Sequence, residues 1–279
     1  MANAPNTTTG AAPYHFAFER VSKRFEARGR ARAAGGADGD GDGGGLAAVE
    51  NVSFGVRRGE AVSLIGPSGC GKSTLLGIGA GLSPPSSGRA CLLGETIIRP
   101  RREIALMLQK DLLLPWRTVL RNVELGLEVQ HRAAAERRDK ALALLAQCKL
   151  EKFIGFYPHE LSGGMRQRAA LARTLALDPQ VLLLDEPFSA LDAQTRVLLR
   201  GDLARMLQQH GRTTLLITHD IVEALALSDR IVVMSHRPGT ILREIEVDLP
   251  HRDDPFLRSL DPRVGDYVAE IWDMLKVVE

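Results

Sequence analysis

The stretch Gly66–Thr74, "GPSGCGKST", decides the fold. It matches G-x-x-x-x-G-K-[ST], in which glycines let the backbone curl so that successive N–H groups point inward at phosphate oxygens. Lys72 adds a positive charge near the terminal phosphates, and the Ser73 hydroxyl is placed to ligate Mg²⁺. A short apolar segment, Ala61–Ile65, precedes the loop, and a helix is expected from Lys72 to about Ala80. This strand–loop–helix context predicts a phosphate-binding site.

An acidic pair follows a second apolar strand in "VLLLDEPFSALDAQTR", residues 181–196. Four apolar residues bury the strand and bring Asp185 to its end, where a carboxylate can hold Mg²⁺. Glu186 is positioned to orient or deprotonate an attacking water. His219 follows the strand expected at Thr213–Thr218, at the sheet edge where ligands bind in parallel sheets. These residues favour nucleotide hydrolysis over a purely structural acidic turn.

A second candidate anion site lies at "LSGGMRQRAALARTLAL", residues 161–177. A helix that begins after Ser-Gly-Gly presents free backbone N–H groups, which attract an anion. One domain therefore carries two helix starts suited to phosphate.

The order of the remaining elements predicts an α/β fold. Short apolar strands alternate with helices, which implies a mainly parallel sheet covered on both faces. Further strands are expected at Ile104–Leu108 and Arg230–Met234, and a helix at Ala193–Gln209. A mainly helical block at 118–177 interrupts the alternation and is expected to form a subdomain. The tail is expected to end in an amphipathic packing helix, whose shared face is Val264, Val268, Ile271, Trp272 and Leu275.

Composition excludes several classes of protein. The 279 residues are 44% hydrophobic and 25% charged, with a net charge of +2, so bulk nucleic-acid binding is not expected. No apolar run is long enough to span a bilayer, and the first residues do not form a secretory signal. Three widely spaced cysteines do not form a disulfide framework or zinc site, which suggests a reducing cytoplasm.

Two segments are expected to be disordered because they lack large apolar residues. They are the N-terminal tail, residues 1–13, and a low-complexity insert, residues 26–45. Asp38–Gly43, "DGDGDG", begins like a calcium loop, but Val49 stands where the bidentate Glu is needed. Disorder is therefore preferred over calcium binding.

Together these motifs resemble the ATP-binding cassette (ABC) ATPases over roughly 14–245. The resemblance implies a P-loop NTPase cassette with a mainly parallel core sheet, an antiparallel β subdomain and a helical signature subdomain at about 110–177. The segment 246–279 is then a C-terminal extension. Met165 replaces the usual Gln of the signature, and Leu108 replaces an aromatic residue often found before Gln109. Neither departure touches a group that does chemistry.

The resemblance also assigns site residues for ATP and Mg²⁺. Glu186, His219, Gln109 and Lys72 are expected to be catalytic, and Ser73, Gln109 and Asp185 to bind the metal. In "SALD", Ser189–Asp192, it identifies the D-loop. The low-complexity insert follows Phe25 directly, and Phe25 matches the aromatic residue that stacks on adenine. The expected nucleotide contacts are Phe25, Gly66, Pro67, Ser68, Gly69, Cys70, Gly71, Lys72, Ser73, Thr74, Ser162, Gly163 and Gly164.

The family pattern implies partners. Two copies are expected to pair head to tail, so that Ser162–Gly164 of one cover the phosphate loop of the other. Two membrane permease subunits and an extracytoplasmic solute-binding protein would complete an importer at the cytoplasmic face of a bacterial inner membrane. Asp111–Trp116, "DLLLPW", resembles the region that receives the membrane subunit, although ordinary core is the alternative.

Several stretches, including "SHRPGTI", look like the group of importers that serves nitrate, taurine and aliphatic sulfonates. Aliphatic sulfonate is the first choice of solute, with taurine, nitrate or another small solute as alternatives. A soluble ABC ATPase of DNA repair or translation is a remote alternative, because the chain has no room for coiled-coil arms and carries one cassette. A non-hydrolysing switch is disfavoured by Glu186 and His219.

Overall fold

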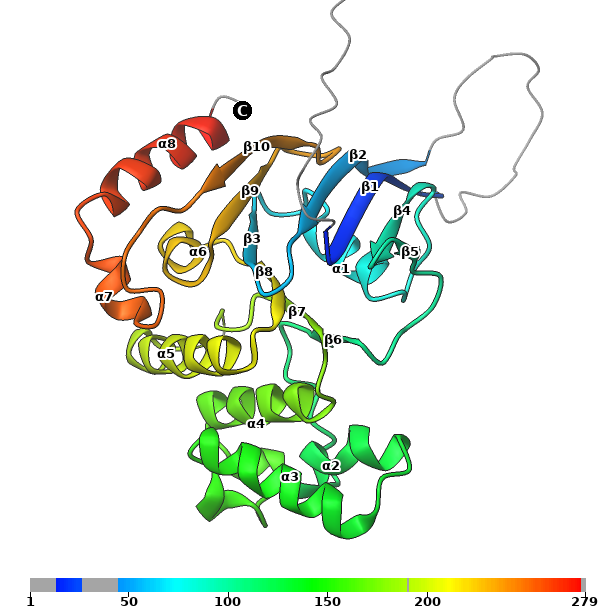
Figure 1. The fold of residues 1–279 in the computed structure, drawn as a ribbon, viewed down its shortest axis with the longest axis vertical. Helices are drawn as coiled ribbons and strands as arrows, with labels where there is room; N and C mark the ends of the chain where they lie inside the picture. Colours follow the sequence, from blue (N-terminus) through cyan, green and yellow to red (C-terminus); the bar gives the residue numbers. More distant parts are fainter. Residues whose placement is uncertain (1–13, 27–44, 190, 277–279) are drawn as a thin grey trace, which may run out of the picture.

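The computed structural model describes residues 14–26, 45–189 and 191–276. The predicted tail, 1–13, and nearly all of the insert, including the Asp38–Gly43 stretch, lie outside these residues. The described chain folds around two sheets, with helices packed beside and below them (Figure 1).

The larger sheet has the strand order β10-β9-β3-β8-β7-β6. Five of its strands are parallel, and β10 runs antiparallel to β9 at one edge. The mainly parallel core sheet predicted from the sequence is therefore confirmed. The strands are β3 (Ala61–Ile65), β6 (Ile104–Met107), β7 (Val181–Asp185), β8 (Thr213–Ile217), β9 (Arg230–Met234) and β10 (Ile241–Glu246).

Strand β7 shows why the central strands of this sheet carry continuous apolar runs such as residues 181–184. Leu182 and Leu184 join the core that the sheet forms with the lower helices, whereas Val181 and Leu183 join the core on the opposite face. Successive side chains point to opposite faces of a strand, so a sheet covered on both sides buries them all.

The second sheet is antiparallel, with the order β2-β1-β4-β5. It packs over α1 and shares that helix's core with one face of the parallel sheet. Its strands are β1 (Phe16–Phe25), β2 (Leu46–Val56), β4 (Ser87–Leu92) and β5 (Glu95–Thr96), and α1 is Lys72–Gly79. The antiparallel β subdomain expected from the resemblance is thus present.

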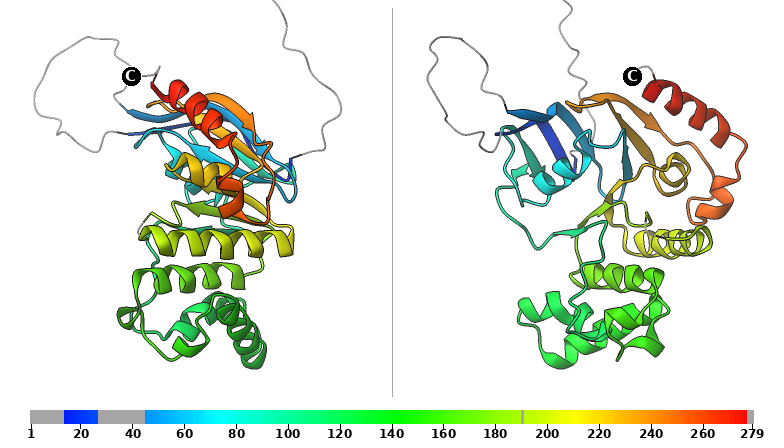
Figure 2. Two further views of the ribbon diagram at one scale, coloured as in Figure 1. Left: turned by 90° about the vertical axis from the view of Figure 1, so that its left-hand side faces the viewer. Right: turned by 180° about the vertical axis from the view of Figure 1, so that it is seen from behind.

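A group of helices lies at one end of the molecule, below the parallel sheet (Figures 1 and 2). Helix α4 packs on α2 and α3, and α5 lies between α4 and the sheet. The helices are α2 (Val119–Val129), α3 (Ala134–Gln147), α4 (Gly163–Ala176) and α5 (Ala193–His210), with short 3₁₀ turns at Glu151–Phe153 and Pro158–Glu160.

The C-terminal extension packs against α6 (Ile221–Leu227) through α7 (Pro255–Ser259) and α8 (Val264–Lys276). Val264 and Ile271 are buried in the core beneath α6. The prediction that Trp272 shares this buried face was wrong, since its side chain is 52% exposed. Trp272 lies at the rim of the stripe defined by the other four residues, where a helix turns by about 100° per residue away from the core.

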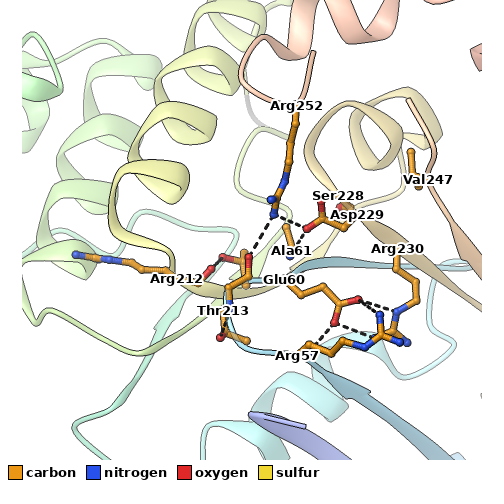
Figure 3. A network of polar contacts seen from close by, with 12 residues as sticks. Arg57, Glu60, Ala61, Arg212, Thr213, Ser228, Asp229, Arg230, Val247 and Arg252 are labelled. Carbon is orange, nitrogen blue, oxygen red and sulfur yellow. Dashed lines mark hydrogen bonds and ion pairs between the residues drawn. The ribbon is translucent and has the colours of Figure 1, made fainter. Parts of the chain in front are cut away.

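Polar contacts secure this extension to the amino-terminal edge of the sheet (Figure 3). Arg252 donates to the Gly59 carbonyl and pairs with Asp229, which precedes β9. Arg258 is 2% exposed and donates to the Ser228 carbonyl at 2.9 Å. Burial lowers the pKa of Arg258. The extension is therefore integral to the fold and leaves the opposite, carboxyl edge of the sheet open.

Candidate active site

A cavity lies at the carboxyl ends of the parallel strands, where the loops after β3, β6, β7, β8 and β9 converge. This is the edge at which open parallel sheets bind ligands. The cavity brings together residues far apart in sequence, most of them predicted site residues. Its lining is Gly66, Ser68, Gly69, Gly71, Lys72, Ser73, Thr74, Gln109, Glu186, His219 and Arg237.

The phosphate loop begins α1, and Lys72 is its first helical residue. The Lys72 ammonium donates to the Gly66 and Pro67 carbonyls, at 2.7 and 2.8 Å. Its side chain is buried, so the loop backbone supplies the oxygens that water would otherwise supply. Phosphate oxygens entering the cavity would offer the same cation stronger, charged acceptors.

Asp185 ends β7 beside the phosphate loop, and the residues here fit a Mg²⁺ ion. Burial raises the pKa of Asp185, while a hydrogen bond from the Ser73 side chain acts in the opposite direction. A carboxylate and a hydroxyl are therefore adjacent. The described residues include no cluster of three His, Cys, Asp or Glu side chains that could hold a metal ion. Mg²⁺ often takes only one or two protein ligands and completes its shell with phosphates and waters, which suits this sparse set.

Glu186 is the centre of a polar cluster inside the cavity. Gln109 Nε2 donates to Glu186 Oε2 at 3.1 Å, and His219 Nδ1 lies 3.3 Å from the same oxygen. Gln109 also donates to Ser189 Oγ at 3.1 Å. Glu186 itself has a positive φ of 44°, which is uncommon outside glycine. The turn after β7 thus holds one carboxylate between an amide and an imidazole.

The signature stretch lies outside this cavity. Ser162 is the N-cap of α4, and its hydroxyl accepts from the Met165 amide at 3.3 Å. A Cβ added to Gly164 would lie 2.5 Å from Thr195 Cγ2, at the start of α5, so a larger residue here would force Thr195 to shift. Ser162, Gly163 and Gly164 do not line the cavity with the phosphate loop. The two helix starts suited to phosphate are therefore separate within one chain.

Three predicted nucleotide contacts also do not line the cavity. Phe25 ends β1, is 45% exposed, and lies under the Lys23 ammonium, which is 5.4 Å from the ring centroid. Pro67 contributes its carbonyl to Lys72, and the buried Cys70 thiol lies 3.7 Å from the Lys72 ammonium. Their assignment to the nucleotide stays a prediction.

The structure adds residues that the motifs did not single out for the site. Arg237, in the loop after β9, lines the cavity. Gln167, buried in α4, donates to the Pro187 carbonyl at 2.6 Å and so joins the signature helix to the turn that holds Glu186. Arg237 was visible only as part of "SHRPGTI", and Gln167 only as a polar residue in a helical pattern.

The segment Asp111–Trp116 is fixed to the signature helix but is only partly core. Arg166 pairs with Asp111 at 3.1 Å, and Arg173 donates to the Asp111 and Leu112 carbonyls. Leu113 is buried, whereas Leu112 is 54% and Trp116 72% exposed. Core packing therefore accounts for Leu113 but not for Leu112 and Trp116.

Comparison with known proteins defines the class. The profile of the ABC transporter family matches residues 49–189. The nitrate import ATP-binding protein NrtD of Synechocystis is 44% identical over 238 residues, covering 84% of this chain and 90% of NrtD. The taurine import ATP-binding protein TauB of Rhizobium johnstonii is 43% identical over 205 residues, covering 74% of this chain and 78% of TauB.

A solved structure supports the same assignment. The ATP-binding cassette MJ0796, a dimer in a post-hydrolysis state bound to ADP and Pi, superposes with a TM-score of 0.70 at 32% identity. The match covers 83% of this chain and 98% of MJ0796. The chain belongs to the ABC transporter family. It has the ABC cassette fold and is an ATPase, and cassettes of this family bind ATP with Mg²⁺.

Proposed function

We propose that this chain is the ATP-hydrolysing subunit of an importer for a small solute such as an aliphatic sulfonate, taurine or nitrate. The observation that carries the catalytic part is the Glu186 carboxylate, which Gln109 and His219 hold at the edge of the phosphate-loop cavity. The similarity to nitrate and taurine import proteins supports the transport part. Among the described residues no helix has the length and apolar character needed to cross a membrane.

In the proposed chemistry, each predicted residue has a defined task. The phosphate-loop N–H groups and Lys72 bind the phosphate chain and offset its charge. Ser73 and Asp185, with Gln109, hold Mg²⁺, which supplies charge neutralisation on the phosphates. Glu186 orients the attacking water and accepts its proton, while His219 stabilises the terminal phosphate. Adenine stacking by Phe25 is the remaining element of the proposal.

The catalytic proposal is tested with Glu186→Gln. This change keeps size and hydrogen bonding but removes the base, so the hydrolysis rate should fall about 10²–10⁴-fold while ATP binding persists. An ATP-bound dimer should accumulate, measurable by light scattering. Glu246→Gln, an exposed carboxylate on β10, is the matched control. Hydrolysis at the wild-type rate in Glu186→Gln would show that the base is another group.

We further propose that Leu112 and Trp116 contact one of the two permease subunits of the importer, at the cytoplasmic face of a bacterial inner membrane. The exposure of both side chains on a segment fixed to α4 supports this, since large exposed apolar side chains gathered on one segment favour a protein contact. Trp116→Ala should reduce transport while basal ATPase activity and thermal stability are kept. Trp272→Ala, the other exposed tryptophan, is the control. Equal loss of transport in both variants would contradict docking at Trp116.

For the solute, the sequence favours an aliphatic sulfonate, and the named relatives favour nitrate or taurine. All three are small solutes that an extracytoplasmic binding protein would deliver. Uptake of labelled alkanesulfonate, taurine and nitrate, compared in cells with and without this gene, separates the three. If cells without this gene took up all three solutes as well as cells with it, the proposed solute group would be contradicted. A soluble role without a membrane partner is less consistent with the exposed Trp116 segment.

A further inference from the structure

Arg237 is an exposed arginine in the loop between β9 and β10 that lines the same cavity as Lys72, Ser73 and Glu186. We propose that Arg237 binds the phosphate chain of the nucleotide and acts as a second cation of the site. This inference rests on the proposed nucleotide site at the phosphate loop. It adds a residue from a loop that no nucleotide-binding motif of the sequence includes.

The Arg237 side chain already lies against the phosphate loop. Its Nε donates to the Gly69 carbonyl at 3.1 Å, and a Cβ built on Gly69 would lie 3.7 Å from Arg237 Nη2. Within the part of the chain that the structure describes, this is the one hydrogen bond found for Arg237, and it has no ion pair. One edge of the guanidinium is thus anchored, and the two terminal nitrogens keep donors for a ligand.

The loop that carries Arg237 is held firmly in place. Ser235 Oγ accepts from the Thr240 amide at 2.9 Å and donates to the His236 carbonyl. Gly239 exchanges backbone hydrogen bonds with β2, from its amide to the Ala48 carbonyl and from the Glu50 amide to its own carbonyl. A Cβ on Gly239 would lie 2.0 Å from the Cys70 carbonyl oxygen, so this loop touches the phosphate loop directly. The position of Arg237 is therefore built into the fold.

The charges in the cavity favour a phosphate ligand for Arg237. Lys72 is buried and bound to two carbonyls, and His219 lies beside the Glu186 carboxylate. The accessible cation among the lining residues is thus Arg237. A guanidinium is always charged and offers paired N–H donors that match phosphate oxygens. A ligand with several negative charges in this cavity would meet both Lys72 and Arg237.

The test measures binding of ATP, ADP and inorganic tripolyphosphate to Arg237→Gln by calorimetry. Losing a charged donor to phosphate should weaken ATP and tripolyphosphate binding about ten- to hundredfold, with an unchanged melting temperature of the ligand-free protein. Arg237→Lys, which keeps the charge without the fork, should recover part of the loss. The slope of log affinity against log salt should become shallower in Arg237→Gln.

Two controls separate this inference from the site on which it rests. Arg243→Gln removes an exposed arginine of β10 that pairs with Glu270 and should bind ATP as the wild type does. Lys72→Ala should abolish ATP binding, and unchanged binding in that variant would overturn the nucleotide site itself. Loss in Lys72→Ala with unchanged binding in Arg237→Gln would overturn the role of Arg237 alone. Weaker ATP binding with unchanged tripolyphosphate binding would place Arg237 on the nucleoside and overturn the phosphate assignment.

Discussion

The phosphate loop and the start of the signature helix are alike in chemistry and different in surroundings. Both present backbone N–H groups at a helix start, next to glycines. The phosphate loop faces a cavity with Lys72, Ser73 and Glu186, whereas Ser162–Gly164 lie at the start of α4 outside that cavity. The side chains that we propose as phosphate and metal ligands therefore gather at the first helix start and not at the second.

This difference explains why one small chain carries two such helix starts. The Arg166 guanidinium beside this helix start already pairs with Asp111 and donates to the Leu161 carbonyl, and none of the proposed metal ligands lies there. Such a helix start can complete a phosphate site supplied by another molecule. We therefore propose that Ser162–Gly164 cover the nucleotide of a second copy in a head-to-tail dimer. The solved MJ0796 cassette with ADP and Pi is itself dimeric.

Ser162→Ala is expected to give the largest difference between the roles of the phosphate loop and of the signature helix. If the signature acts on the partner's nucleotide, ATP binding to the monomer should be unchanged, while cooperative hydrolysis falls about a hundredfold, as for removal of one donor from a charged transition state. ATP titrations below the dimerisation concentration and steady-state rates above it measure the two effects.

The control for Ser162→Ala has to remove a helix cap elsewhere, because loss of an N-cap alone costs about 1 kcal/mol. Thr118→Ala does this at α2, where the Thr118 hydroxyl accepts from the Arg121 amide at 3.3 Å. It should lower stability by a similar amount and leave hydrolysis nearly intact. Weaker monomer binding of ATP in Ser162→Ala would place the signature at the chain's own nucleotide.

The phosphate-loop half of the site could be predicted from sequence because its residues are close together in the chain. Lys72 and Ser73 follow from local spacing, and Asp185 and Glu186 from their place after a buried apolar strand. Arg237 could not be found in this way, since it reaches the cavity only through the pairing of β9 with β3 and the contact of Gly239 with Cys70.

The fold could also be predicted from local sequence patterns. Continuous apolar runs such as 181–184 require a sheet covered on both faces, and the structure shows this. Helical periodicity was less informative for Trp272. It placed this residue on the buried face of α8, whereas the side chain is exposed. The exposure of Leu112 and Trp116 beside the buried Leu113 depends on how the segment lies on α4 and cannot be read from an apolar run.

The two regions are joined within the chain by Gln167, and a smaller effect is expected from Gln167→Met. The change leaves the buried Pro187 carbonyl without its donor, which should cost about 1–3 kcal/mol in the free energy of unfolding. Because Pro187 follows Glu186, the hydrolysis rate should also fall several-fold, with nucleotide binding unchanged. Gln147→Met, on the exposed side of α3, is the control. A stability loss without any change in rate would restrict this link to a structural role.

A last effect, which depends on pH, is expected at Asp185, the proposed metal ligand. Burial raises the pKa of this carboxyl, so its ionised form is disfavoured in the ligand-free protein and its proton is kept to a higher pH than in an ordinary aspartate. A proton and Mg²⁺ compete for the carboxylate, so Mg²⁺ affinity should fall roughly tenfold per pH unit once the pH drops below the raised pKa.

The pH dependence of folding stability has the opposite sign to that of Mg²⁺ affinity. With its folded pKa above the unfolded one, Asp185 destabilises the ligand-free protein when ionised, and this cost is relieved as the pH falls through the raised pKa. Asp185→Asn should remove both pH dependences. Neither the Mg²⁺ affinity nor the contribution of this residue to the melting temperature should then change with pH over that range. The signature half has no ionisable ligand at Ser162–Gly164, so Ser162→Ala should leave the pH profile of Mg²⁺ binding unchanged. A shifted profile in that variant would mean that the two regions share one metal environment within a single chain.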